Sequence, residues 1–113
     1  MFAGNQKLSN LVVIIDNNDL QCDGHLEEVN SPYPIDKKLE DFNFHVQVID
    51  GHSFEELERA FAAAREHKIG PTAIIAKTTK GKGVSFMENR AEWHGSVPNA
   101  EQFSTAMEEL RGS

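Results

Sequence analysis

The stretch LVVIIDNNDLQCDG, residues 11–24, decides the fold of this chain. Five apolar residues, 11–15, are followed abruptly by oxygen-bearing side chains that begin at Asp16. A short β-branched run without polar alternation is typical of a strand buried on both faces, as in a parallel sheet. Open α/β sheets bind ligands beyond the carboxyl ends of their strands, so the polar turn is a candidate site. Its oxygens suit a hard cation such as Mg²⁺, or they bond only to their own backbone in an Asn/Asp-rich turn.

The composition is that of one ordinary globular domain. The chain has 113 residues, of which 39% are hydrophobic and 26% are charged. Its formal charge of −7 argues against a nucleic-acid or anionic-membrane surface, because phosphate groups bind basic patches. Lysines at positions 77, 80 and 82 still allow a small anion to bind locally. No apolar run approaches the roughly 20 residues of a membrane-spanning helix, and the N-terminus has no signal-peptide pattern.

The single cysteine, Cys22, limits the redox chemistry of the chain. It excludes an intrachain disulfide and a zinc site built only from cysteines, and it predicts a reducing, cytoplasmic setting. No partner for a nucleophilic thiol is visible in the sequence. We therefore interpret Cys22 as a packing residue.

Two more strands are predicted after the first. Residues 44–50 alternate between apolar and polar side chains, which indicates a strand near the sheet edge. Residues 72–77, TAIIAK, predict a third strand, and a short helix of about two turns begins at Pro34 between the first two strands. Strands that alternate with helices predict an α/β fold with a partial parallel sheet of about three strands flanked by helices.

Two longer helices carry clear start signals. Ser53 and Glu56 form a capping box that begins a helix ending near His67. Asn99 caps a last helix over residues 100–111. The predicted buried faces are Phe54, Leu57, Phe61 and Ala64 in the first of these helices, and Phe103, Met107 and Leu110 in the second.

Two polar segments remain. Residues 25–33 are predicted to form an exposed loop, because two prolines oppose a continuous helix. Residues 78–94 are too long for a simple connector and predict a functional loop. Its KGKG run, residues 80–83, lacks P-loop spacing; it either brings backbone N–H groups to a phosphate or is a flexible solvated loop. His94 is either a proton donor or anion contact, or a surface histidine.

Four motifs occur in an order that resembles the transketolase family: IIDNNDLQCDG, VIDGHSFEELERAF, PTAIIAKTTKGKGVSFMEN and EWHGSVPNAEQF. The resemblance runs over nearly the whole chain. More specifically, the chain resembles the thiamine-diphosphate-binding domain of the bacterial and archaeal type of transketolase. In that type this domain is often a separate subunit. Deoxyxylulose-phosphate synthase shares parts of the KGKG and WH features, whereas the DGHSFEE and WHGSVP runs favour transketolase.

The resemblance implies a role for five residues. In the family a divalent cation, Mg²⁺ or Ca²⁺, holds the diphosphate of thiamine diphosphate. Asn18 matches the asparagine ligand of that cation, and Leu20 matches the residue that contributes its backbone carbonyl. Cys22 matches a side chain against the cofactor rings, and Lys80 a loop lysine beside the cofactor. His94 matches a catalytic histidine that reaches the diphosphate and the reacting end of the sugar substrate.

The sequence departs from the family in one motif. Gly-Asp-Gly, which supplies another metal ligand, does not occur in it. Residues 1–7 read as the last turn of a helix, so we expect the motif upstream of Met1. Residues 1–113 are then a single partial cofactor-binding domain. The family's pyrimidine-binding domain, whose glutamate activates the cofactor, would be a further partner.

Two functional hypotheses follow. In the first, the chain is part of a transketolase-like two-carbon transferase acting on sugar phosphates of pentose-phosphate type. It is active only when it assembles with the upstream half and the pyrimidine-binding subunit, and it binds cofactor and metal only there. In the second, it is a non-catalytic, truncated transketolase-like fragment that folds, or self-associates as a homo-oligomer through uncovered sheet edges, without binding cofactor. A fragment similar to deoxyxylulose-phosphate synthase is a further alternative. For the isolated chain we expect no activity.

Overall fold

A three-stranded parallel sheet forms the centre of the first of two units in the chain. A computed structural model describes residues 1–112. The first unit comprises Met1–Asn17 and Pro32–Thr78, and the second comprises Asn18–Ser31 and the chain from Thr79 on. Among the residues described, no helix has the length and apolar character needed to span a membrane.

The sheet has the strand order β1-β5-β4, with β1 over Val12–Asn17, β4 over His45–Asp50 and β5 over Thr72–Lys77. Both pairs are parallel, and Val12 and His45 face Thr72 from its two sides. The prediction of a partial parallel α/β sheet is therefore confirmed, as is the prediction that residues 44–50 form an edge strand. Each parallel connection is long enough to contain a helix, as such crossovers require.

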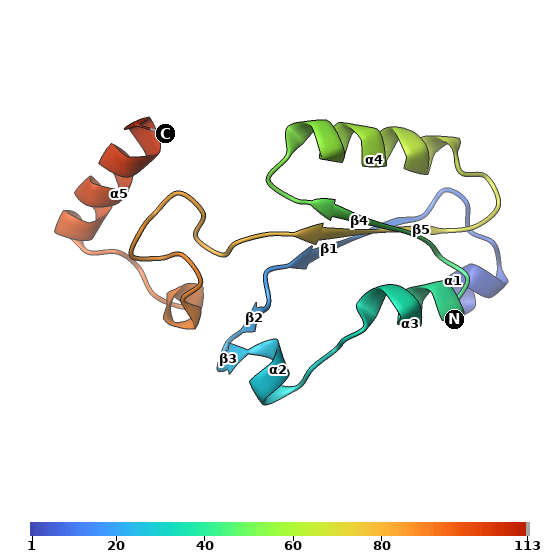
Figure 1. The fold of residues 1–113 in the computed structure, drawn as a ribbon, viewed down its shortest axis with the longest axis horizontal. Helices are drawn as coiled ribbons and strands as arrows, with labels where there is room; N and C mark the ends of the chain where they lie inside the picture. The colour runs from blue at the N-terminus through green and yellow to red at the C-terminus, as the bar shows by residue number, and fades with distance from the viewer. Residues whose placement is uncertain (113) are drawn as a thin grey trace. The chain divides into compact units, whose positions relative to one another are not determined.

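Helices cover both faces of this sheet. Figure 1 shows α4, Phe54–Glu66, on one face, and α1, Phe2–Asn5, with α3, Ile35–Asp41, on the other. On the α4 face the side-chain amide Nε2 of Gln47 donates to the carbonyl of Ala60 over 3.1 Å. This bond ties an edge strand to the helix that follows it.

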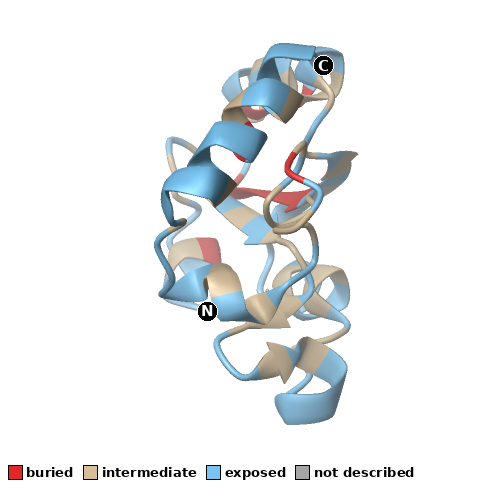
Figure 2. Cartoon of the chain, turned by 90° about the vertical axis from the view of Figure 1, so that its left-hand side faces the viewer, coloured by how far each residue is buried: buried red, intermediate tan, exposed pale blue. Residues whose placement is uncertain are grey.

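The core of the first unit lies along β5. Its residues 72–76 are all buried, as the red strand in Figure 2 shows. Ile74 is fully enclosed. β1, in contrast, exposes alternate residues: Val12 is 37% and Ile14 is 55% exposed. The prediction that residues 11–15 are buried on both faces is wrong, because β1 is an edge strand in these residues and β5 occupies the centre.

Helix α4 starts as predicted but buries a different face. Oγ of Ser53 accepts from the backbone N–H of Glu56 over 3.3 Å, which confirms the N-cap. The reciprocal bond of the predicted capping box is not formed, because the Glu56 carboxylate accepts from the Asp50 N–H instead, over 2.8 Å. Phe54 is 88% exposed, whereas Ala60 and Ala64 are buried. Small side chains let the helix approach the sheet closely, and a first-turn phenylalanine lies beyond that contact. Of the predicted stripe only Ala64 is buried; Leu57 is half-buried, and Phe61 is 38% exposed.

The second unit holds short elements and one long helix. Strands β2, Leu20–Gln21, and β3, Gly24–His25, form an antiparallel hairpin. The predicted loop over residues 25–33 is wrong in part, since α2 covers Leu26–Val29. Pro32 and Pro34 exclude helix only near themselves, which leaves the preceding residues free to form one turn.

The second unit also contains the one-turn 3₁₀ helix η1, Ala91–His94, and α5, Ala100–Gly112. The Oδ1 of Asn99 accepts from the Gln102 N–H, and the Gln102 Oε1 accepts from the Asn99 N–H, both over 2.9 Å. This confirms the predicted cap. The predicted face of α5 is not buried: Phe103 is 59% exposed, while Ala106 is the buried residue.

Candidate functional site

The carboxyl ends of β1 and β5 are tied together in the first unit. The carboxylate of Asp16 accepts from the hydroxyl of Thr78, and the carbonyl of Asn17 accepts from the Thr78 N–H over 3.3 Å. The Oδ1 of Asn17 also accepts from the Tyr33 hydroxyl over 2.8 Å. The two loops that carry the predicted site residues therefore leave the sheet from neighbouring, fixed points.

The polar turn after β1 is stabilised by its own backbone. Oδ1 of Asn18 accepts from the backbone N–H of Leu20 over 3.0 Å, and Asp19 adopts a φ of 62°. This is the Asn/Asp-rich turn that the sequence offered as one interpretation. It does not exclude a cation, since a carboxamide oxygen has a second lone pair. The Asn18 and Leu20 oxygens are hard donors of the type that Mg²⁺ and Ca²⁺ prefer.

Gln21 is a residue that sequence reasoning missed. Its Nε2 is buried and has no hydrogen-bond partner among the residues described. A buried amide donor left unpaired costs about 1–3 kcal/mol, so such an atom calls for an explanation. Strand β2, which carries Gln21, packs beside η1. No signal in the sequence could have identified this atom, because a glutamine between Leu20 and Cys22 reads as an ordinary turn residue.

Cys22 lies in the turn of the hairpin between β2 and β3, and it is exposed. Its interpretation as a packing residue is therefore wrong. A two-residue turn points its side chains away from the strands, so the thiol is not enclosed. An exposed position is compatible with a contact to a bound group, which stays a prediction.

The KGKG run forms a closed turn with its own hydrogen bonds. The carbonyl of Lys80 accepts from the Asn89 N–H over 3.0 Å. The Gly83 N–H, one of the groups expected to face a phosphate, donates to Oε1 of Glu88 over 2.9 Å. Gly81 and Gly83 both have positive φ, at 71° and 88°. The loop is thus an ordered turn, and its lysine side chains are the groups left to meet an anion.

His94 ends η1 and is exposed. The turn is anchored by Trp93, whose indole N–H donates to the carbonyl of Phe86 over 2.9 Å. The Phe86 and Trp93 rings also contact at a centroid distance of 5.3 Å. Apart from the bond between Asn18 and Leu20, no hydrogen bond or ion pair links the five predicted site residues within residues 1–112.

Metal binding would need donors beyond the acidic, histidine and cysteine side chains described. No group of three such side chains among residues 1–112 could hold a metal ion. The oxygens of Asn18 and Leu20 are therefore a partial ligand set that fits a metal only with further donors. Elsewhere in the second unit, the hydroxyl and backbone N–H of Ser85 both donate to the Glu109 carboxylate. The hydroxyl bond is the main cause of a lowered pKa for Glu109.

Comparison with known proteins gives a consistent result. Residues 1–111 match the family described as transketolase, thiamine diphosphate binding domain. The chain is 44% identical over 109 residues to one of the subunits of apulose-4-phosphate transketolase from Phocaeicola vulgatus. It is 37% identical over 110 residues to the 6-deoxy-6-sulfo-D-fructose transketolase subunit SqwG of Clostridium sp. strain MSTE9.

These matches cover 96–97% of this chain, but only 39–40% of the two relatives. The fold is also similar to the crystal structure of transketolase from Campylobacter jejuni, with a TM-score of 0.90 and 31% identity. That superposition covers 97% of this chain and 17% of the solved one.

Proposed function

Because the chain belongs to the transketolase family, as part of its thiamine diphosphate binding domain, we propose that it supplies half of a cofactor site. The complete assembly would transfer a two-carbon ketol group between sugar phosphates. The observation that carries this proposal is the family match over residues 1–111, with the Asn18 turn following a parallel strand. When bound, thiamine diphosphate supplies carbanion-stabilising chemistry.

In this proposal Asn18 Oδ1 and the Leu20 carbonyl are ligands of Mg²⁺ or Ca²⁺. Both are oxygen donors, and the hydrogen bond between the Asn18 side chain and the Leu20 N–H limits the orientations of both. The metal would in turn hold the diphosphate group. The full donor set would include an aspartate from a Gly-Asp-Gly motif, which residues 1–113 do not contain.

The other residues would contact the cofactor or the substrate. The Lys80 ammonium would neutralise negative charge on the diphosphate, and Cys22 would contact the cofactor rings. His94 would contact the reacting end of the sugar and exchange a proton there, as imidazole does near neutral pH. The buried Nε2 of Gln21 would find an acceptor on the bound group, which would explain why it lacks one in the described residues.

We further propose that residues 1–113 are one part of a larger cofactor domain and are inactive alone. The curated relatives of which the chain spans 39–40% are themselves named as subunits. The further metal ligand would come from an upstream half, and the glutamate that activates the cofactor from a pyrimidine-binding subunit. The half-exposed side chains of Val12 and Ile14 on edge strand β1 support self-association of the chain when those partners are absent. The relatives' names favour transketolase over deoxyxylulose-phosphate synthase.

Calorimetric titration tests the cofactor site. Thiamine diphosphate with Mg²⁺ is titrated into the 113-residue chain. A second titration uses a chimera in which this chain replaces the matching segment of the Phocaeicola vulgatus protein. The partner subunit of that protein is present in the second titration. We expect weak or no binding to the chain alone and Mg²⁺-dependent binding to the chimera. Asn18→Ala should weaken that binding by about a hundredfold or more, because a metal ligand is lost.

Asn10→Ala, an exposed position before β1, is the matched control and should leave binding unchanged. Tight binding by the isolated chain would overturn the half-site proposal. Binding by the chimera that survives Asn18→Ala would overturn the assignment of the metal ligand.

A further inference from the structure

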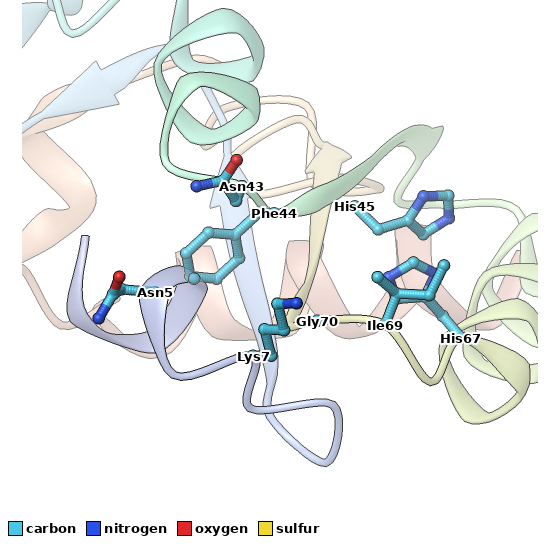
Figure 3. A pocket seen from close by; sticks show the side chains of 9 residues that line it. Asn5, Lys7, Asn43, Phe44, His45, His67, Ile69 and Gly70 are labelled. Atoms are coloured by element: carbon cyan, nitrogen blue, oxygen red, sulfur yellow. The ribbon is translucent and has the colours of Figure 1, made fainter.

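A second concave site lies in the first unit, at the edge of the sheet where its strands begin. A cavity of about 470 Å³ opens where β4 and β5 begin (Figure 3). His45, the first residue of β4, and Gly70, shortly before β5, are part of its lining. The predicted cofactor residues instead follow the carboxyl ends of β1 and β5. The proposed cofactor chemistry therefore does not use this cavity.

Two helix ends build one side of the cavity. Helix α1 is followed by Lys7, with a φ of 51°, and helix α3 is followed by Asn43, with a φ of 63°. A backbone bond of the Schellman type closes each end, Leu8 N–H to Ala3 O and Phe44 N–H to Leu39 O, both over 3.1 Å. The buried Gly4 lies directly against the backbone of Phe42 and locks the two ends together.

Two imidazoles form the opposite side. The rings of His45 and His67 are stacked, with centroids 4.6 Å apart and planes 16° from parallel. His45 belongs to β4 and His67 caps the end of α4, so the pair joins a strand to a helix. Stacking fixes the direction in which both nitrogen-bearing ring edges point. Figure 3 shows the pair next to Ile69 at the rim of the cavity.

The polar side chains of the cavity favour an anion. Lys7 brings a full positive charge, and none of the nine lining residues is acidic, although the chain has 18 carboxylates. Within residues 1–112, the side chains of Asn5, Lys7, Asn43, His45 and His67 make no hydrogen bond or ion pair. Their donors are thus free to bind a ligand.

The ends of α1, α3 and α4 meet here, and helix C-termini are weakly negative. Two of these helices have only 4 and 7 residues. Their last carbonyls accept from N–H groups of the closing turns described above, so a full lysine charge outweighs them.

The cavity also has an apolar wall. Phe44 contributes an aromatic ring, and Ile69, which lies next to the imidazole pair, is 75% exposed (Figure 3). Small-molecule sites typically combine such apolar surface with a few polar groups that fix orientation. We propose that this cavity binds a small organic anion, consisting of a planar apolar body with one phosphate or carboxylate group. The body lies against Phe44 and Ile69, and the anionic group meets Lys7 and the imidazole N–H groups.

Histidine resonances in NMR spectra of the 113-residue chain provide the test. Phenyl phosphate is titrated first, and the five histidines give an internal control. We expect saturable shifts at His45 and His67, and none at His25, His52 and His94. Benzoate, titrated in the same way, tells whether the cavity prefers a carboxylate or a phosphate. Equal shifts at all five histidines, or none, would overturn the site.

Two comparisons test the chemistry of recognition. Inorganic phosphate and phenol should each bind at least about tenfold more weakly than phenyl phosphate, since each lacks one half of the ligand. Lys7→Asn should weaken phenyl phosphate about tenfold; asparagine tolerates the positive φ of this position, so the fold is kept. Lys37→Gln, at an exposed lysine of α3, is the matched control. Binding unchanged by Lys7→Asn, or inorganic phosphate as strong as phenyl phosphate, would contradict the proposal.

Discussion

The two units of the chain are stabilised in different ways. The first has a continuous core along β5, where Ala73, Ile74, Ile75 and Ala76 are all at most 5% exposed. Among the described residues of the second unit, the buried hydrophobic side chains are Val84 and Ala106. Hydrophobic burial is the dominant stabilising term in folding, so most of the stability should reside in the first unit.

In the second unit, local hydrogen bonds of side chains contribute a larger share of the stability than they do in the first. Ser85 donates twice to Glu109, and Asn99 and Gln102 bond reciprocally. All five predicted cofactor residues belong to this unit. Segments with few buried apolar contacts open locally at low free-energy cost. The residues with predicted chemical roles therefore lie in the unit whose stability depends most on the hydrogen bonds of turns and helix caps.

The largest expected effect lies in the core of the first unit. Ile74→Ala should lower the free energy of unfolding by about 3 kcal/mol, because Ile74 is completely buried and truncation leaves a cavity. Ile14→Ala, at a side chain that is 55% exposed, should cost less than about 1 kcal/mol. Urea denaturation followed by circular dichroism measures both. Equal losses would show that β1 is buried against another surface in solution.

Gly81→Ala should destabilise the second unit by about 2 kcal/mol and leave the first unchanged. Gly81 has a φ of 71°, and an added Cβ would lie 2.7 Å from the Met87 carbonyl oxygen. Gly95→Ala is the control, since no heavy atom lies within 4 Å of its Cβ position. Amide hydrogen exchange resolves the effect by residue. Faster exchange throughout β5 as well would mean that the two units unfold together.

Ser53→Ala should cost the first unit about 1 kcal/mol, since it removes the N-cap bond of α4. Ser104→Ala, at an exposed position inside α5, should change stability by less than about 0.5 kcal/mol. Thermal unfolding measures the pair, and Ser53→Asp should restore the loss. If Ser53→Ala left the stability unchanged, the bond from the Asp50 N–H to the Glu56 carboxylate, and not the Ser53 cap, would stabilise the start of α4.

The smallest effect is a pH dependence in the second unit. The hydroxyl and N–H of Ser85 lower the pKa of Glu109 below its ordinary value of 4.5. A lowered pKa in the folded state means that the unfolded state binds the proton more tightly, so this stabilisation is present above pH 4.5 and is lost as the pH falls through the folded pKa. The Ser85 amide resonance should shift in that range, and Glu109→Gln should abolish the shift. If the shift of the Ser85 amide resonance persisted in Glu109→Gln, a group other than Glu109 would be its cause.

The sequence predicted elements well where a local signal determines them. The TAIIAK run became β5 with the predicted bounds, Thr72–Lys77, and the Ser53 cap started α4. Burial was predicted less well because it depends on neighbours far along the chain. Residues 11–15 and 73–76 are similar apolar runs, yet only the second lies between two strands. Phe54 and Phe103 were placed in a core by helical period alone, and both are exposed.

In the candidate site, too, local sequence signals predicted some features, whereas features that depend on tertiary packing were not predicted. The positions of Asn18, Leu20, Cys22, Lys80 and His94 came from a resemblance of motifs, and the structure shows them in one unit without testing their roles. The bond from the Leu20 N–H to Asn18 Oδ1 is of the kind expected of the Asn/Asp-rich turn, one of the two interpretations of this stretch, although its two partners were not predicted. Gln21 could not be identified, because the burial of one amide nitrogen depends on how β2 packs beside η1.

The pairing of β1 with β5 also constrains how the chain can be made. Val12 and Thr72 face each other although sixty residues separate them. At a synthesis rate of roughly 5–20 residues per second, residues 11–15 emerge on the order of 3–12 seconds before their partner strand. During that interval an unpaired apolar segment is open to chaperones or to the same segment of a neighbouring nascent chain. Because β5 lies between β1 and β4, both of these edge strands are translated before the strand with which they pair.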